Sequence, residues 1–186
     1  QVDISVGPRT ADVSVQRVTV VDVSPQAVLG RLTARVKVGQ GEAFELRGWL
    51  ERGWFIDSVE LISASLTTPL AEAMIDAVNE PPDWRVVRQR GRNELRVAFK
   101  SAVTPATPMV LQITGHRAGI SPGVSFSASE LDMVVLRDEV QEPVLALKTG
   151  AEMTIETEQD VASATINDPQ LSGLIEDSGV RVRLPA

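Results

Sequence analysis

Residues 32–51, LTARVKVGQGEAFELRGWLE, decide the fold class, because apolar and polar side chains alternate along almost the whole stretch. Every second side chain in residues 32–38 is apolar, which is the two-residue period of a half-buried strand. The Gly-Gln-Gly run at 39–41 is a turn signal, since glycine adopts positive φ without strain. Alternation resumes in residues 43–51. The stretch therefore predicts two strands joined as a hairpin.

The same two-residue period recurs along most of the 186-residue chain, for example in residues 13–21. A second hairpin is expected where residues 84–89 and 94–100 flank the sequence Arg-Gly-Arg-Asn. Many short strands, punctuated by glycine and proline, favour an all-β fold, an antiparallel β-sandwich. Further strands are predicted at 2–6, 54–61, 109–114, 124–129, 132–137, 144–148, 152–157, 161–166 and 180–184.

One segment has a helical pattern instead. In TPLAEAMIDAVNEPP, residues 68–82, the apolar residues Leu70, Met74 and Val78 lie four positions apart and form one stripe of a helix. A threonine before the stripe can cap the helix, and two prolines after it end the helix. The sequence predicts one short α-helix at residues 69–79, packed against the sheets.

A polar stretch, DEVQEP, marks a candidate boundary at residues 138–143. We predict a β-sandwich domain over residues 1–142. Residues 143–186 are predicted to add further strands, which either complete the same sandwich or form a small second unit. The chain opens on Gln1 and both of its ends read as strands, so we expect it to be a module cut from a longer polypeptide.

Composition argues against several functions. The chain has no cysteine, which excludes disulfides, thiol nucleophiles and cysteine-based metal sites. Nucleic-acid binding needs a cationic surface, but the net charge is -7, and Arg88, Arg90 and Arg92 form only a local basic cluster. No apolar run approaches the ~18 residues of a membrane span. We therefore expect neither a nucleic-acid partner nor a membrane span.

The sequence GISPG at residues 119–123 matches the G-x-S-x-G nucleophile elbow of serine hydrolases, and the single histidine, His116, precedes it. An elbow joins a strand to a helix, whereas a strand-like sequence follows here. The residue after the serine is Pro122, which has no N–H to offer an oxyanion hole. We expect a loop at GISPG and a strand-end His116 bonded to the backbone. No catalytic residue, metal ligand or cofactor is predicted, although calcium binding by a surface loop stays open.

The tryptophans have different expected environments. If residues 43–51 form a regular strand, two sets of side chains face opposite ways: Phe44, Leu46, Gly48 and Leu50 toward the core, and Glu45, Arg47, Trp49 and Glu51 away from it. Trp49 is then either a ligand contact or covered by the 69–79 helix or another domain. Trp54 is expected in the core, with a bulge near Asp57 and Ser58. Trp84 is also expected in the core.

Two stretches, FELRGWLERGWFIDSVEL (44–61) and NELRVAFKSAVTPATPMVLQITGHR (93–117), resemble uncharacterised β-sandwich segments of very large secreted or envelope-associated bacterial proteins. In those segments a G-W-x-(I/V)-x-x-V strand precedes an L-x-V-x-(F/L) strand, and a P-x-x-L-x-I-x-G strand follows. The resemblance covers residues 30–137. It implies an extracytoplasmic structural or recognition module and carries over no catalytic residue.

We therefore expect a non-enzymatic structural or interaction module of a larger bacterial protein, located in the periplasm, on the cell surface or outside the cell. Its expected partners are neighbouring domains of the parent protein or other envelope proteins. The first alternative is a carbohydrate-binding module, in which Trp49, Glu45, Arg47 and Glu51 contact a polysaccharide. The second alternative is an accessory domain or fragment of a glycoside hydrolase, because carboxylates are plentiful.

Overall fold

A computed structural model describes residues 11–62, 81–121, 123–139 and 143–149, and the backbone of residues 180–183. The helix expected at 69–79 lies outside these residues. So do the strands expected at 2–6, 152–157 and 161–166.

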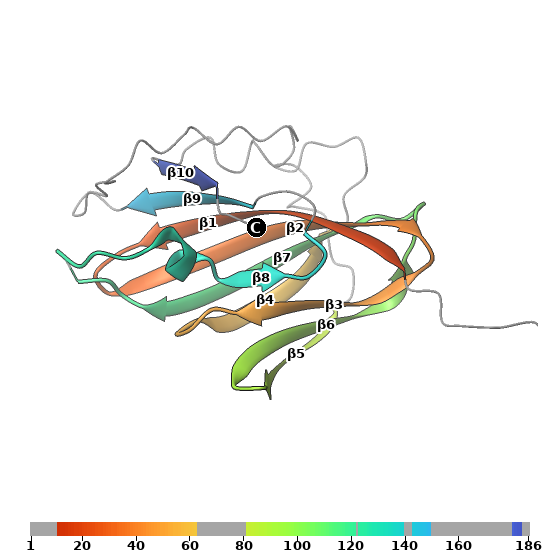
Figure 1. Ribbon diagram of the computed structural model, residues 1–186, viewed down its shortest axis with the longest axis horizontal. Coiled ribbons are helices and arrows are strands. Elements are labelled where there is room, and N and C mark those ends of the chain that lie inside the picture. Colours follow the sequence, from red (N-terminus) through yellow and green to blue (C-terminus); the bar gives the residue numbers. More distant parts are fainter. Residues whose placement is uncertain (1–10, 63–80, 122, 140–142, 150–179, 184–186) are drawn as a thin grey trace, which may run out of the picture.

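Two β-sheets pack face to face with the core between them (Figure 1), which confirms the predicted β-sandwich. The larger sheet has six strands in the order β10-β9-β1-β2-β7-β4, and the smaller has four in the order β5-β6-β3-β8. Described strand pairs are antiparallel except β1 with β9, which is parallel. The strands are β1 Asp12–Val23, β2 Ala27–Gln40, β3 Ala43–Leu50, β4 Phe55–Ile62, β5 Asp83–Gln89, β6 Arg92–Val103, β7 Met109–Ala118, β8 Val134–Leu136, β9 Val144–Thr149 and β10 Val180–Arg183.

The core follows the predicted alternation. Leu32, Ala34, Val36 and Val38 on β2 are all buried, as expected from their shared face. They belong to one hydrophobic cluster with residues of the opposite sheet, such as Leu95 on β6. Burial of these apolar side chains between the two sheets is the main source of stability in such a fold.

The predicted hairpin between β2 and β3 is wrong. β2 pairs with β1 and β7, whereas β3 pairs with β6 and β8 in the other sheet. The turn at Gly41, with φ of 87°, therefore carries the chain across the sandwich. Gly53, also with φ of 87°, lies on the return crossing to β4. A glycine turn is compatible both with a hairpin and with a crossing between sheets. Here the chain crosses, and β7, which comes later in the sequence, pairs with β2 instead of β3.

The predicted faces of β3 are correct except at one end. Leu46, Gly48 and Leu50 are buried, but Phe44 is 56% exposed. The β3–β6 register shifts between Ala43 and Glu45, so the extra residue of this bulge turns the Phe44 side chain outward. A bulge expected in β4 is confirmed, because the β4–β7 register shifts between Ile56 and Ser58.

Trp54 lies in the core, as predicted, with only 2% of its surface exposed. The prediction for Trp84 is wrong, since this side chain is 37% exposed. Trp84 lies on β5, the last strand of its sheet, opposite the buried Val97 of β6. The core therefore ends at β6 and does not continue under β5.

The strand expected at 124–129 is also wrong. One turn of 3-10 helix, η1, covers Ala128–Leu131 instead. This segment passes from β7 in one sheet to β8 in the other, and its backbone groups are paired locally: the N–H groups of Glu130 and Asp132 donate to carbonyls three residues earlier.

β9 lies beside β1 in the six-stranded sheet, and its residues Leu145 and Leu147 belong to the core cluster. Residues 150–179 lie outside the described part, so the predicted division between residues 142 and 143 stays a prediction. No helix among the described residues is long and apolar enough to span a membrane.

Candidate functional site

The outer face of the four-stranded sheet carries charged and aromatic side chains on three adjacent strands. Trp49 on β3 lies opposite Glu94 on β6 and Val135 on β8, and Arg47 lies opposite Arg96. The buried residues of β3 and β6 alternate with these and face the core, so this set faces away from it. We call this surface the arginine–tryptophan face; its members are Glu45, Arg47, Trp49, Glu94, Arg96 and Arg137.

Glu94 lies at the centre of this face, yet its side chain is 0% exposed. Its two carboxylate oxygens accept hydrogen bonds from different arginines, Arg96 Nε at 2.7 Å and Arg137 Nη2 at 2.8 Å. A buried carboxylate is stable only when it is paired and hydrogen-bonded. Glu94 therefore holds both guanidinium groups in place, while the two arginine side chains stay partly exposed.

Arg137 makes a second contact, with its guanidinium carbon 5.4 Å from the ring centroid of Trp49. A cation over an aromatic ring is attracted by the negative ring face. Trp49 itself is half-buried. The tryptophan and the buried glutamate thus fix Arg137 from two directions.

Arg47 is held by its neighbour on the same strand. Its Nε and Nη2 groups donate to Glu45 Oε2 at 2.9 Å and 2.5 Å. This hydrogen bonding, with the charge attraction of Glu45, raises the pKa of Arg47 above its ordinary value. Arg47 thus presents a charged guanidinium whose position is fixed by Glu45.

This arrangement suits the binding of anions. The face holds three arginines against two glutamates, which leaves one positive charge in excess on a chain of net charge -7. A guanidinium carries five N–H donors in a planar fork, and within the described part of the chain Arg137 donates one hydrogen bond, to Glu94. Its other donors can meet a ligand, and carboxylates match their geometry well.

The structure brings three of the four predicted ligand contacts together: Glu45, Arg47 and Trp49. Glu51 follows the end of β3, and its backbone N–H donates to the carbonyl of Met133 at the start of the crossing to β4. Ligand binding by these four residues stays a prediction.

Sequence reasoning missed Glu94, Arg96 and Arg137 as members of the face. The alternation in NELRV, residues 93–97, already placed Glu94 and Arg96 on one polar side of their strand. No sequence signal placed Arg137 beside them, because β8 reaches β3 only through the tertiary fold.

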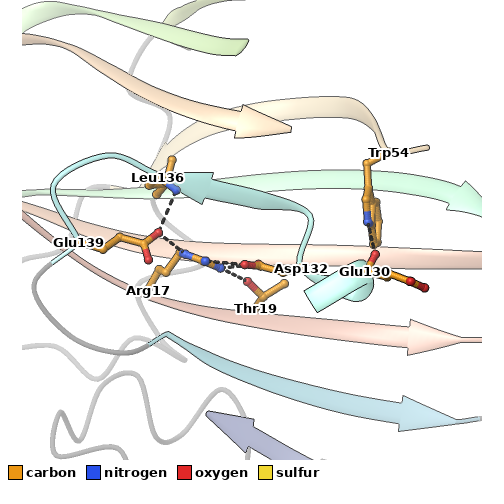
Figure 2. Close-up of polar contacts among 7 residues, drawn as sticks. All are labelled: Arg17, Thr19, Trp54, Glu130, Asp132, Leu136 and Glu139. Atoms are coloured by element: carbon orange, nitrogen blue, oxygen red, sulfur yellow. Dashed lines mark hydrogen bonds and ion pairs between the residues drawn. The ribbon is translucent and has the colours of Figure 1, made fainter. Parts of the chain in front are cut away.

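A second charged cluster lies inside the sandwich (Figure 2). Arg17 on β1 donates two hydrogen bonds to Asp132, at 2.5 Å and 2.6 Å, and one to Glu139 at 2.5 Å. Thr19 accepts a further bond from Arg17, and Glu139 also accepts the backbone N–H of Leu136. This cluster ties the segment around β8 to β1.

Burial alone would lower the pKa of Arg17, but hydrogen bonds and charge attraction from Asp132 and Glu139 outweigh burial and raise it. Arg17 thus stays charged over the whole physiological range. The carboxylates that surround it are already engaged, which makes the cluster a structural element.

His116 lies on β7 and is exposed. The prediction of a backbone partner is wrong: Nδ1 lies 2.7 Å from Asp57 Oδ1 at the β4 bulge, and the ring stacks on Phe55 at 5.6 Å. The bulge causes this, because it turns Asp57 toward the neighbouring strand. Among the described residues, no three His, Asp or Glu side chains are grouped to hold a metal ion.

No family model and no curated protein matches this chain. Among solved structures it is similar to an M1 zinc metallopeptidase from Deinococcus radiodurans, at 12% identity and a TM-score of 0.45, over 79% of this chain and 34% of that one. It is also similar to leukotriene A4 hydrolase from Saccharomyces cerevisiae, at 10% identity and a TM-score of 0.45, over 74% of this chain and 23% of that one. This chain thus spans about a third or less of the length of either enzyme. The comparisons assign it to no family.

Proposed function

We propose that this chain is a non-enzymatic interaction module, a β-sandwich of a larger bacterial protein outside the cytoplasm. Its arginine–tryptophan face binds a neighbouring domain or another envelope protein. The observation that carries the proposal is the buried Glu94, which holds Arg96 and Arg137 on a solvent-facing side of the sheet. The extracytoplasmic location is supported by the resemblance of residues 44–61 and 93–117 to envelope-associated segments.

Fixed arginines favour binding because little side-chain entropy is lost when a ligand meets them. Free arginine side chains carry about 2 kcal/mol of rotamer entropy. Glu94 and Glu45 restrict three such side chains before any partner arrives. Arginine and tryptophan are also the residue types that dominate binding energy at protein interfaces.

The environment of Trp49 favours a protein partner over a polysaccharide. A sugar stacks on an open ring face, but Arg137 lies over the Trp49 ring and the side chain is half-buried. The glycoside hydrolase alternative is tested separately with a panel of chromogenic glycosides, on which we expect no turnover.

The test uses acrylamide quenching of tryptophan fluorescence. Subtracting the signal of Trp49→Phe from that of the wild type isolates the Trp49 emission. We expect poly-L-glutamate to protect Trp49 from acrylamide and neutral polysaccharides to leave it unprotected. Arg47→Gln should weaken poly-L-glutamate binding about tenfold, or ~1.4 kcal/mol, because one guanidinium is lost.

Arg31→Gln is the matched control, since Arg31 is an exposed arginine on β2 in the other sheet. It should change the affinity little. Protection of Trp49 by a polysaccharide would favour the carbohydrate-binding alternative. Equal quenching with and without poly-L-glutamate would contradict the proposed binding face.

A further inference from the structure

We propose that the partner adds an extended acidic segment as a new strand along β5, at the end of the four-stranded sheet. This inference rests on the proposed function and specifies its partner, because β5 continues the sheet whose outer side is the arginine–tryptophan face. Figure 1 shows the β5–β6 hairpin at the lower margin of the molecule, with β5 outermost.

β5 is a regular edge. It is seven residues long, contains no proline, and pairs with β6 without any register shift. By contrast, β8 at the other end of the sheet has three residues, and β4 at the end of the larger sheet is bulged. Proteins protect unused edges by short strands, prolines, bulges or charged side chains. β5 is neither short nor bulged and contains no proline, and the charged side chains that it carries, Asp83, Arg85 and Arg88, leave its backbone open to a partner of matching charge.

The backbone of β5 offers hydrogen bonds along this edge. Gln89 lies opposite Arg92 around the two-residue turn Arg90–Gly91, and the closing pair of such a turn exchanges hydrogen bonds. Bonded and non-bonded pairs then alternate along an antiparallel ladder. The N–H and C=O groups of Trp84, Val86 and Arg88 therefore point away from β6, toward the position of an added strand.

The side chains of the hairpin define what that strand must look like. Trp84 and Val86 are exposed on one side of β5 and Arg85 on the other, with Arg88 in line with Trp84. Added side chains next to Trp84 and Val86 should be apolar, and those next to Arg85 should be acidic. The expected partner segment alternates apolar and acidic residues.

Charge selects this partner over a second copy of the chain. Arg85, Arg88, Arg90 and Arg92 are exposed, and none has a carboxylate partner within the described residues. Two β5 edges placed side by side would bring two of these clusters of uncompensated positive charge close together, and like charges repel each other. An acidic strand is attracted instead.

The test titrates the full chain into a labelled nine-residue peptide of alternating glutamate and valine. Binding is measured by the fluorescence anisotropy of the peptide. Two control peptides accompany it: one N-methylated at every residue, which cannot donate hydrogen bonds, and one with glutamates and valines in separate blocks. We expect the alternating peptide to bind, and both controls to bind at least about tenfold more weakly.

Variants of Val86 locate the contact. Val86→Pro removes one N–H that points to the added strand and leaves the bonds to β6, so affinity should fall about tenfold or more. Val86→Thr keeps that N–H and should bind nearly as the wild type does. If circular dichroism shows that Val86→Pro does not fold, the N-methylated peptide on the wild-type chain decides the question.

Equal binding of the N-methylated peptide would overturn strand addition. If the N-methylated peptide bound equally well but Arg47→Gln weakened its binding, the arginine–tryptophan face would still be a binding surface, without strand addition at β5. Absence of binding by every peptide would also overturn the inference, while Trp49 quenching by poly-L-glutamate decides the proposed function separately. Light scattering tests whether a second copy of the chain occupies the edge. A dimer of the wild type that becomes a monomer on Val86→Pro would show this and would overturn the proposal of an acidic partner.

Discussion

Arg17 illustrates how one residue can hold two parts of the molecule together. Its side chain is 1% exposed, and it contacts Asp132 and Glu139, which lie more than a hundred positions later in the chain. Breaking a buried ion pair from one side leaves an uncompensated charge in the interior, which costs more than the pair itself contributes.

We predict that Arg17→Met lowers the free energy of unfolding by about 3–5 kcal/mol, because both carboxylates lose their buried partner. Urea unfolding followed by tryptophan fluorescence measures the change. Arg31→Met, at an exposed position on β2, is the control and should stay within about 0.5 kcal/mol of the wild type. A loss below about 1 kcal/mol for Arg17→Met would mean that the cluster is dispensable.

At the scale of elements, the β5–β6 hairpin depends on its turn. Arg90 and Gly91 have φ values of 51° and 81°, the two positive angles of a type I′ turn. Glycine adopts such angles freely, but arginine pays a steric cost there. Asparagine tolerates this region much better than arginine.

Arg90→Asn should therefore stabilise the chain by about 0.5–1 kcal/mol, because it relieves part of the backbone strain. The urea midpoint should rise accordingly. Arg92→Asn makes the same chemical change within β6, at a residue without positive φ, and should bring no such gain. A midpoint for Arg90→Asn at or below that of the wild type would contradict the strain argument.

For the whole molecule, the question is whether residues from 143 onward fold with the rest. Leu145 on β9 is fully buried and belongs to the same core cluster as Trp54. A residue that contributes to one shared core should affect the unfolding of all of it.

We predict that Leu145→Ala lowers the stability reported by Trp54 by about 2–5 kcal/mol. Replacing Trp49 and Trp84 by Phe isolates the Trp54 signal. Leu29→Ala, an exposed leucine on β2, is the matched control and should have little effect. If Leu145→Ala left the unfolding transition of Trp54 unchanged and destabilised a second, separate transition, residues 143–186 would form their own unit.

The sequence by itself determined the strands and most of their faces. Two-residue alternation predicted the buried side of Leu32 and Val36 and the place of Trp54, because strand geometry fixes these locally. The Arg-Gly-Arg-Asn sequence predicted the β5–β6 turn. Half of the candidate site followed in the same way, since Glu45, Arg47 and Trp49 share one polar side of β3.

Apart from the β5–β6 hairpin, only the tertiary structure decided which strands became neighbours. The pairing of β2 with β7, the outward turn of Phe44, and the approach of Arg137 to Glu94 were not readable from local patterns. Arg17 meets Asp132 across 115 positions of the chain. Alternation states which side of a strand is apolar, whereas pairing depends on the summed free energy of contacts between segments that are distant in sequence.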